Sequence, residues 1–180
     1  MRIIGGSHRG RKLAEFKGSD IRPTADRVKE SLFNILAAKI SGATVLDLFC
    51  GSGNLGLESL SRGAACVHFN DVSKESLSVL KKNLAALKIE SGVKVTCGDY
   101  LACLNSTAMR YDMIFIDPPY AAEYGAKALK VIADRELLTA DGVAVYERDR
   151  PFGEAVTGLK KVDERRYGKT YLTFFKREEQ

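Results

Sequence analysis

Four consecutive residues near the middle of the chain carry the most chemical information: Asp117, Pro118, Pro119 and Tyr120. They follow an apolar run at 113–116, so a buried strand is expected to end on a carboxylate, two prolines and an aromatic ring. Each proline fixes φ near about −65° and lacks an N–H, so the segment neither coils into a helix nor continues a sheet. The expected result is a rigid shelf that suits a planar group bearing an NH₂. The alternative is a turn that ends the strand, with Asp117 as its cap.

The shelf predicts three catalytic residues. The two N–H groups of an aryl amine would donate to the Asp117 carboxylate and the Pro118 carbonyl, which favours a pyramidal nitrogen with its lone pair available as a nucleophile. Tyr120 would stack on the base that bears the amine. This chemistry requires neither a metal nor a covalent intermediate.

A glycine-rich loop follows an earlier predicted strand. Gly51, Gly53 and Gly56 match the dinucleotide-binding pattern G-x-G-x-x-G, but Asp47 stands directly before the loop. A carboxylate there would repel a pyrophosphate and attract a cofactor that carries an ammonium and a sulfonium. We therefore expect S-adenosylmethionine rather than NAD, bound by Asp47, Gly51 and Gly53. An NAD-dependent oxidoreductase would leave Asp47 and Asp117 without a role.

Two further acids follow predicted strands. Asp71 is placed to accept hydrogen bonds from both ribose hydroxyls, and Val72 to pack on the adenine face. Asp99 can accept from the adenine amine, and Tyr100 beside it belongs to the same predicted cofactor site. One acid at a strand end is usually a helix cap or a turn former. Four acids on one edge of a sheet indicate a ligand site.

These residues require a particular set of elements around them. Buried strands are predicted at 44–48, 66–71, 93–97, 113–116 and 143–146, with helices at 24–40, 54–62, 73–88 and 122–133. Thr24 and Ser73 are the expected caps of two of these helices. The alternation predicts a doubly wound α/β domain with a mostly parallel, Rossmann-like sheet. Residues 159–166 and 170–176 are expected to form an antiparallel hairpin at the end of that sheet.

Composition and charge narrow the class of protein. The 180 residues predict one domain, divided into a basic N-terminal arm at 1–23 and a cofactor-binding and catalytic core at 24–180. The apolar runs are too short for a membrane span, and neither the N-terminus nor the four scattered cysteines indicate secretion, so we expect a cytoplasmic, monomeric protein. The two histidines and four cysteines form no ligand pattern, so no metal site is predicted.

Positive charge is concentrated at both ends of the chain. Residues 1–30 hold eight Lys and Arg against four Asp and Glu, and residues 147–180 hold nine against seven, whereas residues 31–146 hold eleven against twelve. Basic margins beside a near-neutral body suit a polyanion, since phosphate contacts supply most sequence-independent affinity for nucleic acids. The predicted RNA-binding residues on the arm are Arg2, Arg9, Arg11, Lys12 and Arg22. On the hairpin they are Arg165, Arg166 and Lys169. The alternative role of Arg22 and Thr24 is to close over the cofactor.

The glycine loop, the second-strand acid, Gly98-Asp99-Tyr100 and Asp-Pro-Pro-Tyr, in this order, resemble class I S-adenosylmethionine-dependent methyltransferases that modify exocyclic amines. More narrowly, the chain resembles the RsmD family in the segments 1–6, 10–13, 22–24, 33–36 and 167–168. This resemblance implies methylation of N2 of a guanine in small-subunit (16S) ribosomal RNA, with the RNA or the small-subunit particle as partner. Lys169 and the charged tail are not matched to the family pattern.

Two other functions remain open from the sequence. An adenine-N6 methyltransferase acting on DNA or RNA would use the same shelf and the same cofactor. A non-enzymatic RNA-binding assembly factor would keep the cofactor-binding fold but would have lost the catalytic site. Intact acids at all four strand ends count against such a loss.

Overall fold

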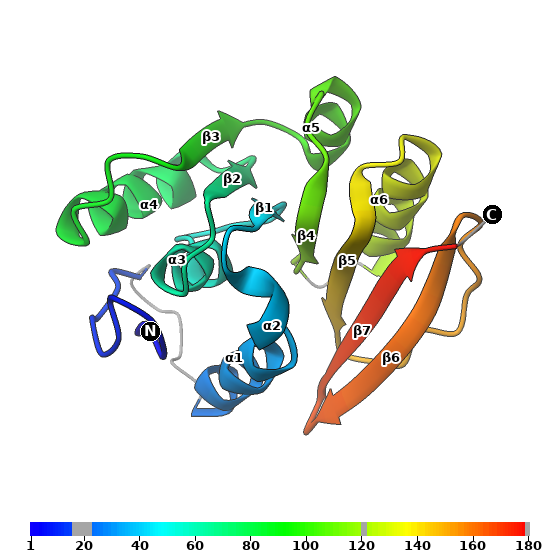
Figure 1. Cartoon of the computed structure of the whole chain (residues 1–180), viewed down its shortest axis with the longest axis horizontal. Coiled ribbons are helices and arrows are strands. Elements are labelled where there is room, and N and C mark those ends of the chain that lie inside the picture. Colours follow the sequence, from blue (N-terminus) through cyan, green and yellow to red (C-terminus); the bar gives the residue numbers. More distant parts are fainter. Residues whose placement is uncertain (16–22, 120–121, 179–180) are drawn as a thin grey trace.

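The computed structural model describes residues 1–15, 23–119 and 122–178. Its sheet has seven strands in the order β3-β2-β1-β4-β5-β7-β6 (Figure 1). The strands are β1 (Thr44–Asp47), β2 (Cys66–Asp71), β3 (Val93–Cys97), β4 (Tyr111–Ile116), β5 (Leu138–Arg148), β6 (Leu159–Tyr167) and β7 (Thr170–Arg177). Neighbours from β3 to β5 pair in parallel, whereas β7 is antiparallel to both β5 and β6. The predicted doubly wound sheet with a C-terminal hairpin is confirmed, and its strand order reverses between β1 and β4.

Helices cover both faces of this sheet. They are α1 (Pro23–Ile35), α2 (Ala37–Ile40), α3 (Asn54–Ser61), α4 (Lys74–Ala86), α5 (Tyr100–Ser106) and α6 (Ala122–Asp134). Val45 belongs to a first core with side chains of α1 to α4, and its neighbour Leu46 to a second core with side chains of α5 and α6. Because successive residues of a strand point to opposite faces, the two cores lie on opposite sides of the sheet.

Three predicted elements differ from the structure. The helix expected at 24–40 is two helices, α1 and α2, separated at Leu36. Thr24 is not its cap, because α1 already begins at Pro23, a residue whose fixed φ suits the first turn. The short helix α5 was not predicted, and β5 is longer than expected at both ends. Ser73 does cap α4, accepting a hydrogen bond from the Ser76 N–H.

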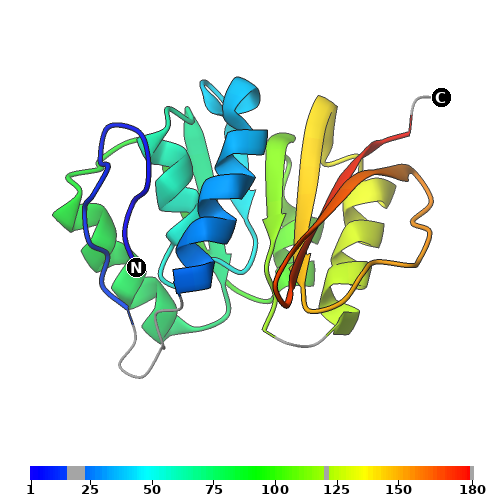
Figure 2. The same cartoon turned by 90° about the horizontal axis from the view of Figure 1, so that it is seen from below.

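The described part of the N-terminal arm is a folded loop and not a free tail. An isolated antiparallel bridge joins Arg2 to Lys12, and Ile3 and Leu13 are buried in the first core. Gly6 has φ of +76°, and a Cβ there would lie 1.8 Å from the Ser61 carbonyl oxygen, so only glycine fits. The arm lies at the β3 side of the molecule, while the hairpin of β6 and β7 lies at the other end (Figures 1 and 2).

Candidate active site

The predicted acids come together at the carboxyl edge of the parallel strands. Asp47 and Asp71 are the last residues of β1 and β2, Asp99 follows β3, and Asp117 follows β4. Asp47 is in register with Phe115 of β4, so Asp117 lies one strand across and two residues beyond it. The acids therefore occupy four adjacent strand ends on either side of the point where the strand order reverses, which is where open α/β sheets bind ligands.

Two of these carboxylates hold the glycine loop in place. Asp47 Oδ2 accepts the Gly56 N–H at 2.8 Å, and Asp71 Oδ2 accepts the Gly51 N–H at 2.8 Å. Asp71 Oδ1 also accepts the Ser73 N–H at 2.8 Å, which fixes the start of α4. The glycine loop is therefore hydrogen-bonded to the ends of β1 and β2. The Asp71 oxygens still have free lone pairs that can accept hydrogen bonds from a ligand's hydroxyl groups.

Asp47 is buried almost completely, with 2% of its surface exposed. This burial raises its pKa to about 7, and the nearby charges of Asp117 and Asp71 act in the same direction. No ion pair within the described residues compensates this carboxylate. A cationic ligand at this edge would therefore be attracted strongly, because little water screens the charge.

Gly56 allows α3 to pack tightly against β2. A Cβ at this position would lie 2.2 Å from a ring carbon of Phe69, whereas a Cβ at Gly98 would meet nothing within 4 Å. We expect Gly56→Ala to lower the free energy of unfolding by about 1–3 kcal/mol through overpacking. Gly98→Ala is the matched control and should change it by less than about 0.5 kcal/mol. Denaturant unfolding of both variants tests this, and equal effects would contradict the packing shown here.

The residues predicted to meet the adenine lie beside the loop. Asp99 Oδ1 accepts the N–H groups of Leu101 and Ala102, so this residue is a helix cap, as the simpler interpretation of an acid at a strand end allowed. Asp99 is nevertheless exposed, and its second oxygen takes no hydrogen bond from the described residues. Val72 is 74% exposed, so its apolar side chain is available to cover a planar ligand.

Tyr100 is buried and forms the centre of an aromatic row. Its ring centroid lies 5.2 Å from that of Phe49 and 5.4 Å from that of Tyr124. Phe49 follows the first strand end and Tyr124 lies on α6, so the row connects the cofactor edge with the helix after the shelf. Sequence reasoning had not identified Phe49 or Tyr124.

The shelf begins at the end of β4. The Asp117 side chain is open to solvent, as an acceptor site requires, yet the protein around the strand end desolvates the carboxylate and raises its pKa to about 6. Pro118 is partly buried. Tyr120 lies outside the described residues, and its stacking role stays a prediction.

Two asparagines that were not predicted from the sequence form hydrogen bonds that connect segments at the carboxyl edge of the sheet. Asn70 is 1% exposed, and its Nδ2 donates to the carbonyls of Leu48 and Gly98 at 3.1 and 3.2 Å, joining the ends of β1, β2 and β3. Asn83 of α4 donates through Nδ2 to the carbonyls of Ala14 and Ser52. A polar residue inside an apolar periodic segment was the only available signal for either one.

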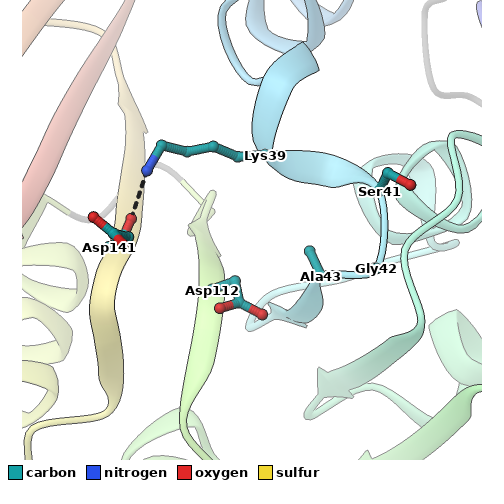
Figure 3. A pocket seen from close by; sticks show the side chains of 6 residues that line it. All are labelled: Lys39, Ser41, Gly42, Ala43, Asp112 and Asp141. Atoms are coloured by element: carbon teal, nitrogen blue, oxygen red, sulfur yellow. Dashed lines mark hydrogen bonds between the residues drawn. The ribbon is translucent and has the colours of Figure 1, made fainter.

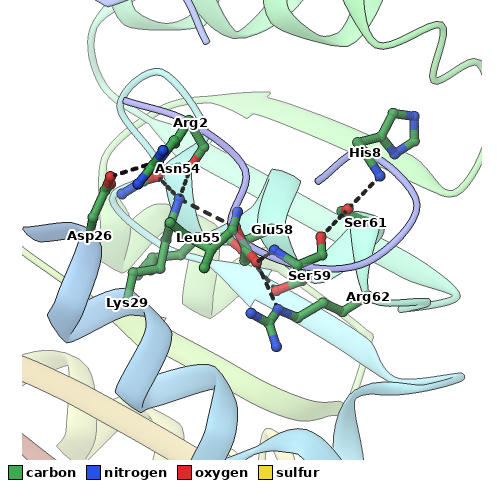
Figure 4. Close-up of polar contacts among 12 residues, drawn as sticks. Arg2, His8, Asp26, Lys29, Asn54, Leu55, Glu58, Ser59, Ser61 and Arg62 are labelled. Atoms are coloured by element: carbon green, nitrogen blue, oxygen red, sulfur yellow. Dashed lines mark hydrogen bonds and ion pairs between the residues drawn. The ribbon is translucent and has the colours of Figure 1, made fainter. Parts of the chain in front are cut away.

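A buried ion pair connects the arm to α1 and α3 (Figure 4). Glu58 is fully buried and accepts the N–H groups of Ile4 and Gly5, each at 2.8 Å, and the Arg62 Nε–H at 2.7 Å. Lys29, 2% exposed, lies 3.3 Å from Glu58 and donates to the Arg2 carbonyl and to Asn54 Oδ1. Since Asn54 begins α3 directly after the glycine loop, the arm and the loop share one polar network.

The basic residues proposed for RNA binding differ in availability. Arg2 is paired with Asp26, whereas the side chains of Arg9, Arg11 and Lys12 are exposed and form no ion pair with the described residues. Arg22 lies outside the described residues. On the hairpin, Arg165 is paired with Asp163, and the Arg166 guanidinium lies over the Tyr171 ring, while Lys169 is exposed.

A cavity of about 280 Å³ lies at the opposite edge of the sheet (Figure 3). Its polar groups are already engaged: Asp112 accepts the Thr44 N–H and the Thr139 hydroxyl, and Lys39 donates to the Asp141 carbonyl. The cavity adjoins the amino ends of β1 and β4, away from the four acids, so we assign it no ligand.

Among the described residues, no group of three or more His, Cys, Asp or Glu side chains could hold a metal ion. None of the described helices combines the length and the apolar character needed to cross a membrane.

The sheet order, the glycine loop held by two carboxylates and the acid row at the switch point define a class I methyltransferase. The chain belongs to the family described as "Conserved hypothetical protein 95", whose model matches residues 1–176.

Relatives of the chain carry this similarity over most of its length. Ribosomal RNA small subunit methyltransferase D of Escherichia coli is 39% identical over 146 residues, covering 81% of this chain and 73% of that protein. YlbH of Bacillus subtilis is 37% identical over 182 residues, covering 98% and 99%. The solved structure of yhhF from Escherichia coli superposes with a TM-score of 0.88 at 31% identity, covering 100% and 99%. The resemblance to the RsmD family is thereby confirmed.

Proposed function

We propose that the protein transfers a methyl group from S-adenosylmethionine to the exocyclic N2 amine of a guanine in small-subunit ribosomal RNA. The observation that carries this proposal is the position of Asp117, one strand across from the cofactor edge, followed by two prolines. The names of the relatives support ribosomal RNA as the substrate. The choice of N2 of guanine rests on the resemblance to the RsmD family.

The residues of the edge fit the cofactor in charge and in shape. Asp71 can accept the ribose hydroxyls, Asp99 has a free oxygen for the adenine amine, and exposed Val72 can cover the adenine face. The uncompensated charge of Asp47 favours the cationic end of the molecule. When bound, the cofactor supplies an activated methyl group on its sulfonium.

The protein contributes orientation and electrostatics to the reaction. Asp117 accepts one N–H of the acceptor amine and the Pro118 carbonyl accepts the other, so the nitrogen lone pair can point at the methyl group. Together such effects supply several kcal/mol of barrier reduction. The amine, once methylated, loses one proton, which the Asp117 carboxylate can accept.

The exposed arm charges are proposed to contact RNA phosphates. Replacing Arg9 and Arg11 together by glutamine should lower the slope of log affinity against log salt by roughly 1.4, about 0.7 per phosphate contact on single-stranded RNA. The matched control is Lys127→Gln with Lys130→Gln, which removes two exposed cations from α6. Filter binding over a salt series measures the slopes of both variants. Equal slopes for the arm variant and the α6 control would contradict a contact between the arm and RNA phosphates.

The proposed function is tested by incubating the protein with methyl-labelled cofactor and, separately, naked 16S RNA, assembled small subunits and duplex DNA, followed by nucleoside analysis. We expect N2-methylguanosine from one of the two ribosomal substrates and none from DNA. Methylated adenosine would contradict the guanine assignment and would instead support an adenine-N6 methyltransferase. Tight RNA binding without methylation would indicate an assembly factor.

A further inference from the structure

A fifth acid, Glu147, lies next to Asp117 at the same edge of the sheet. Tyr146 of β5 is in register with Ile116 of β4, so Glu147 follows on β5 where Asp117 follows on β4. Parallel neighbouring strands are about 4.8 Å apart, which brings the two backbones close together. The order of acids across the edge is thus Asp99, Asp71, Asp47, Asp117 and Glu147.

The side chains of Asp117 and Glu147 leave the same face of the sheet. Phe115 and Val145 belong to the first core, and Ile116 and Tyr146 to the second. Because the faces alternate, the next residues return to the side of the first core. Asp117 continues this alternation, since a residue before proline is restricted to extended conformations.

No cation of the described residues compensates Glu147, whose half-buried side chain forms no ion pair or hydrogen bond with them. On β7 its register partner is the apolar Leu172. The guanidinium of Arg148, the next residue, lies over the Tyr146 and Phe152 rings, which belong to the second core on the other face. Lys29 of α1 is engaged with Glu58.

Two adjacent carboxyl groups without a cation cannot both be ionised at low cost, so the pair retains a proton near neutral pH. Burial and the charge of Asp117 raise the pKa of Glu147 to about 8, above the value of about 6 for Asp117. The Glu147 side chain is less exposed than that of Asp117, so desolvation favours the neutral form at Glu147, and we assign the shared proton to this residue. The edge then offers one acceptor, the Asp117 carboxylate, beside one donor, the Glu147 hydroxyl.

We propose that Glu147 in its acid form donates a hydrogen bond to the ring nitrogen beside the amine that is methylated, while Asp117 accepts from the amine itself. This inference rests on the proposed function and deepens it. A base that presents an amine next to an unprotonated ring nitrogen complements this pair. For guanine N2, that nitrogen is N3, so the base would enter with its N2–N3 edge toward the two acids.

The test compares Glu147→Gln with Glu147→Met in single-turnover methyl transfer to ribosomal RNA between pH 5 and 9. Glutamine keeps a donor at every pH, so its rate should stay within about threefold of the wild type at pH 7 and should lack the decline expected of the wild type above about pH 8. Methionine has a similar size but no donor, and its rate should fall about 10- to 100-fold at pH 7. Equal rates for the two variants, whether both low or both normal, would overturn the role of Glu147.

A second measurement is independent of catalysis. Carbon-13 NMR titration of the carboxyl groups, with Glu147→Gln used for assignment, should show Glu147 titrating above pH 7 in the protein without RNA. Titration below about pH 6 would overturn the acid form of Glu147. If the wild type methylates no guanine while Glu147 titrates above pH 7, guanine methylation is contradicted, but the proton shared by Asp117 and Glu147 is supported.

Discussion

Replacing Asp117 by alanine should nearly abolish methyl transfer, with an expected loss of about 10²- to 10³-fold, while affinity for the cofactor should stay within a few-fold of the wild type. The loss is large because the carboxylate is expected to act on the amine while its nitrogen changes shape, and removing one such preorganised partner typically costs 10² to 10³ in rate. The proton that leaves the amine also loses Asp117 as its proposed acceptor. Single-turnover transfer and calorimetric titration with S-adenosylhomocysteine separate the two effects.

The rate of the wild type should also depend on the ionisation of Asp117. Protonation removes the acceptor, and the pKa of Asp117 is raised to about 6 from its ordinary 3.8, so the rate should fall as the pH drops through about 6. The contribution of Asp117 to folding stability depends on pH in the opposite direction to its contribution to the rate. A raised carboxyl pKa means that the folded state binds the proton more tightly than the unfolded state, so this group favours folding at low pH and opposes it as the pH rises through 6.

Asp117→Asn distinguishes these effects, since it keeps the shape of the side chain and removes its charge. It should transfer methyl groups almost as poorly as Asp117→Ala and yet be more stable than the wild type at pH 8, because the pKa values of Asp47 and Glu147 are raised partly by the Asp117 charge. An asparagine variant with full activity would exclude the proposed contact between the carboxylate and the amine.

Much of the fold and of the edge could be predicted because the signals are local. Apolar runs that end on an acid predict both a strand and the side at which its ligand binds, which is how Asp47, Asp71 and Asp117 were placed. The glycine pattern predicted the loop, and the charge of Asp47 argued against a pyrophosphate. The structure adds that the same carboxylates accept the loop's own N–H groups.

The remaining features depend on which strands become neighbours. Glu147 is 30 positions after Asp117 and was counted only as one charge of a basic tail, until the pairing of β4 with β5 placed the two acids side by side. Asn83 contacts Ala14 and Ser52, which are distant in sequence, and local periodicity says nothing of such contacts. The separation of α1 from α2 at Leu36 was missed because the apolar spacing continues across it.

Glu58→Gln should destabilise the protein more than any surface substitution. It leaves buried Lys29, and also Arg62, without the Glu58 carboxylate as counter-charge, a change that costs about 3–5 kcal/mol of unfolding free energy. For a domain of this size, the melting temperature should fall by about 6–20 °C. The matched control is Glu123→Gln on α6, whose exposed pair with Lys127 should contribute less than about 1 kcal/mol. Thermal and urea unfolding measure both, and a small effect at Glu58 would mean that Lys29 is not held as described.

A compensating variant separates the lost charge from the lost packing. Lys29→Met combined with Glu58→Leu replaces the Lys29–Glu58 pair by apolar side chains, and it should recover part of the stability lost in Glu58→Gln, because well-packed apolar groups can substitute for a buried pair. Arg62 would still lack its Glu58 partner, which it contacts at 2.7 Å. The N–H groups of Ile4 and Gly5 would still lack their acceptor. The recovery should therefore be incomplete, and the arm should remain more accessible to protease than in the wild type.

Glu58→Gln should also affect the cofactor site at the carboxyl edge of the sheet. Lys29 donates to Asn54, which begins α3 directly after the glycine loop, and Asn83 links the arm residue Ala14 to Ser52 of that loop. Loosening the arm removes supports from the loop, so Glu58→Gln should weaken binding of S-adenosylhomocysteine as well as of RNA. The arm is then a supporting part of the cofactor site, and its contacts with RNA are best probed by exposed charges such as Arg9 and Arg11, whose removal leaves this network intact.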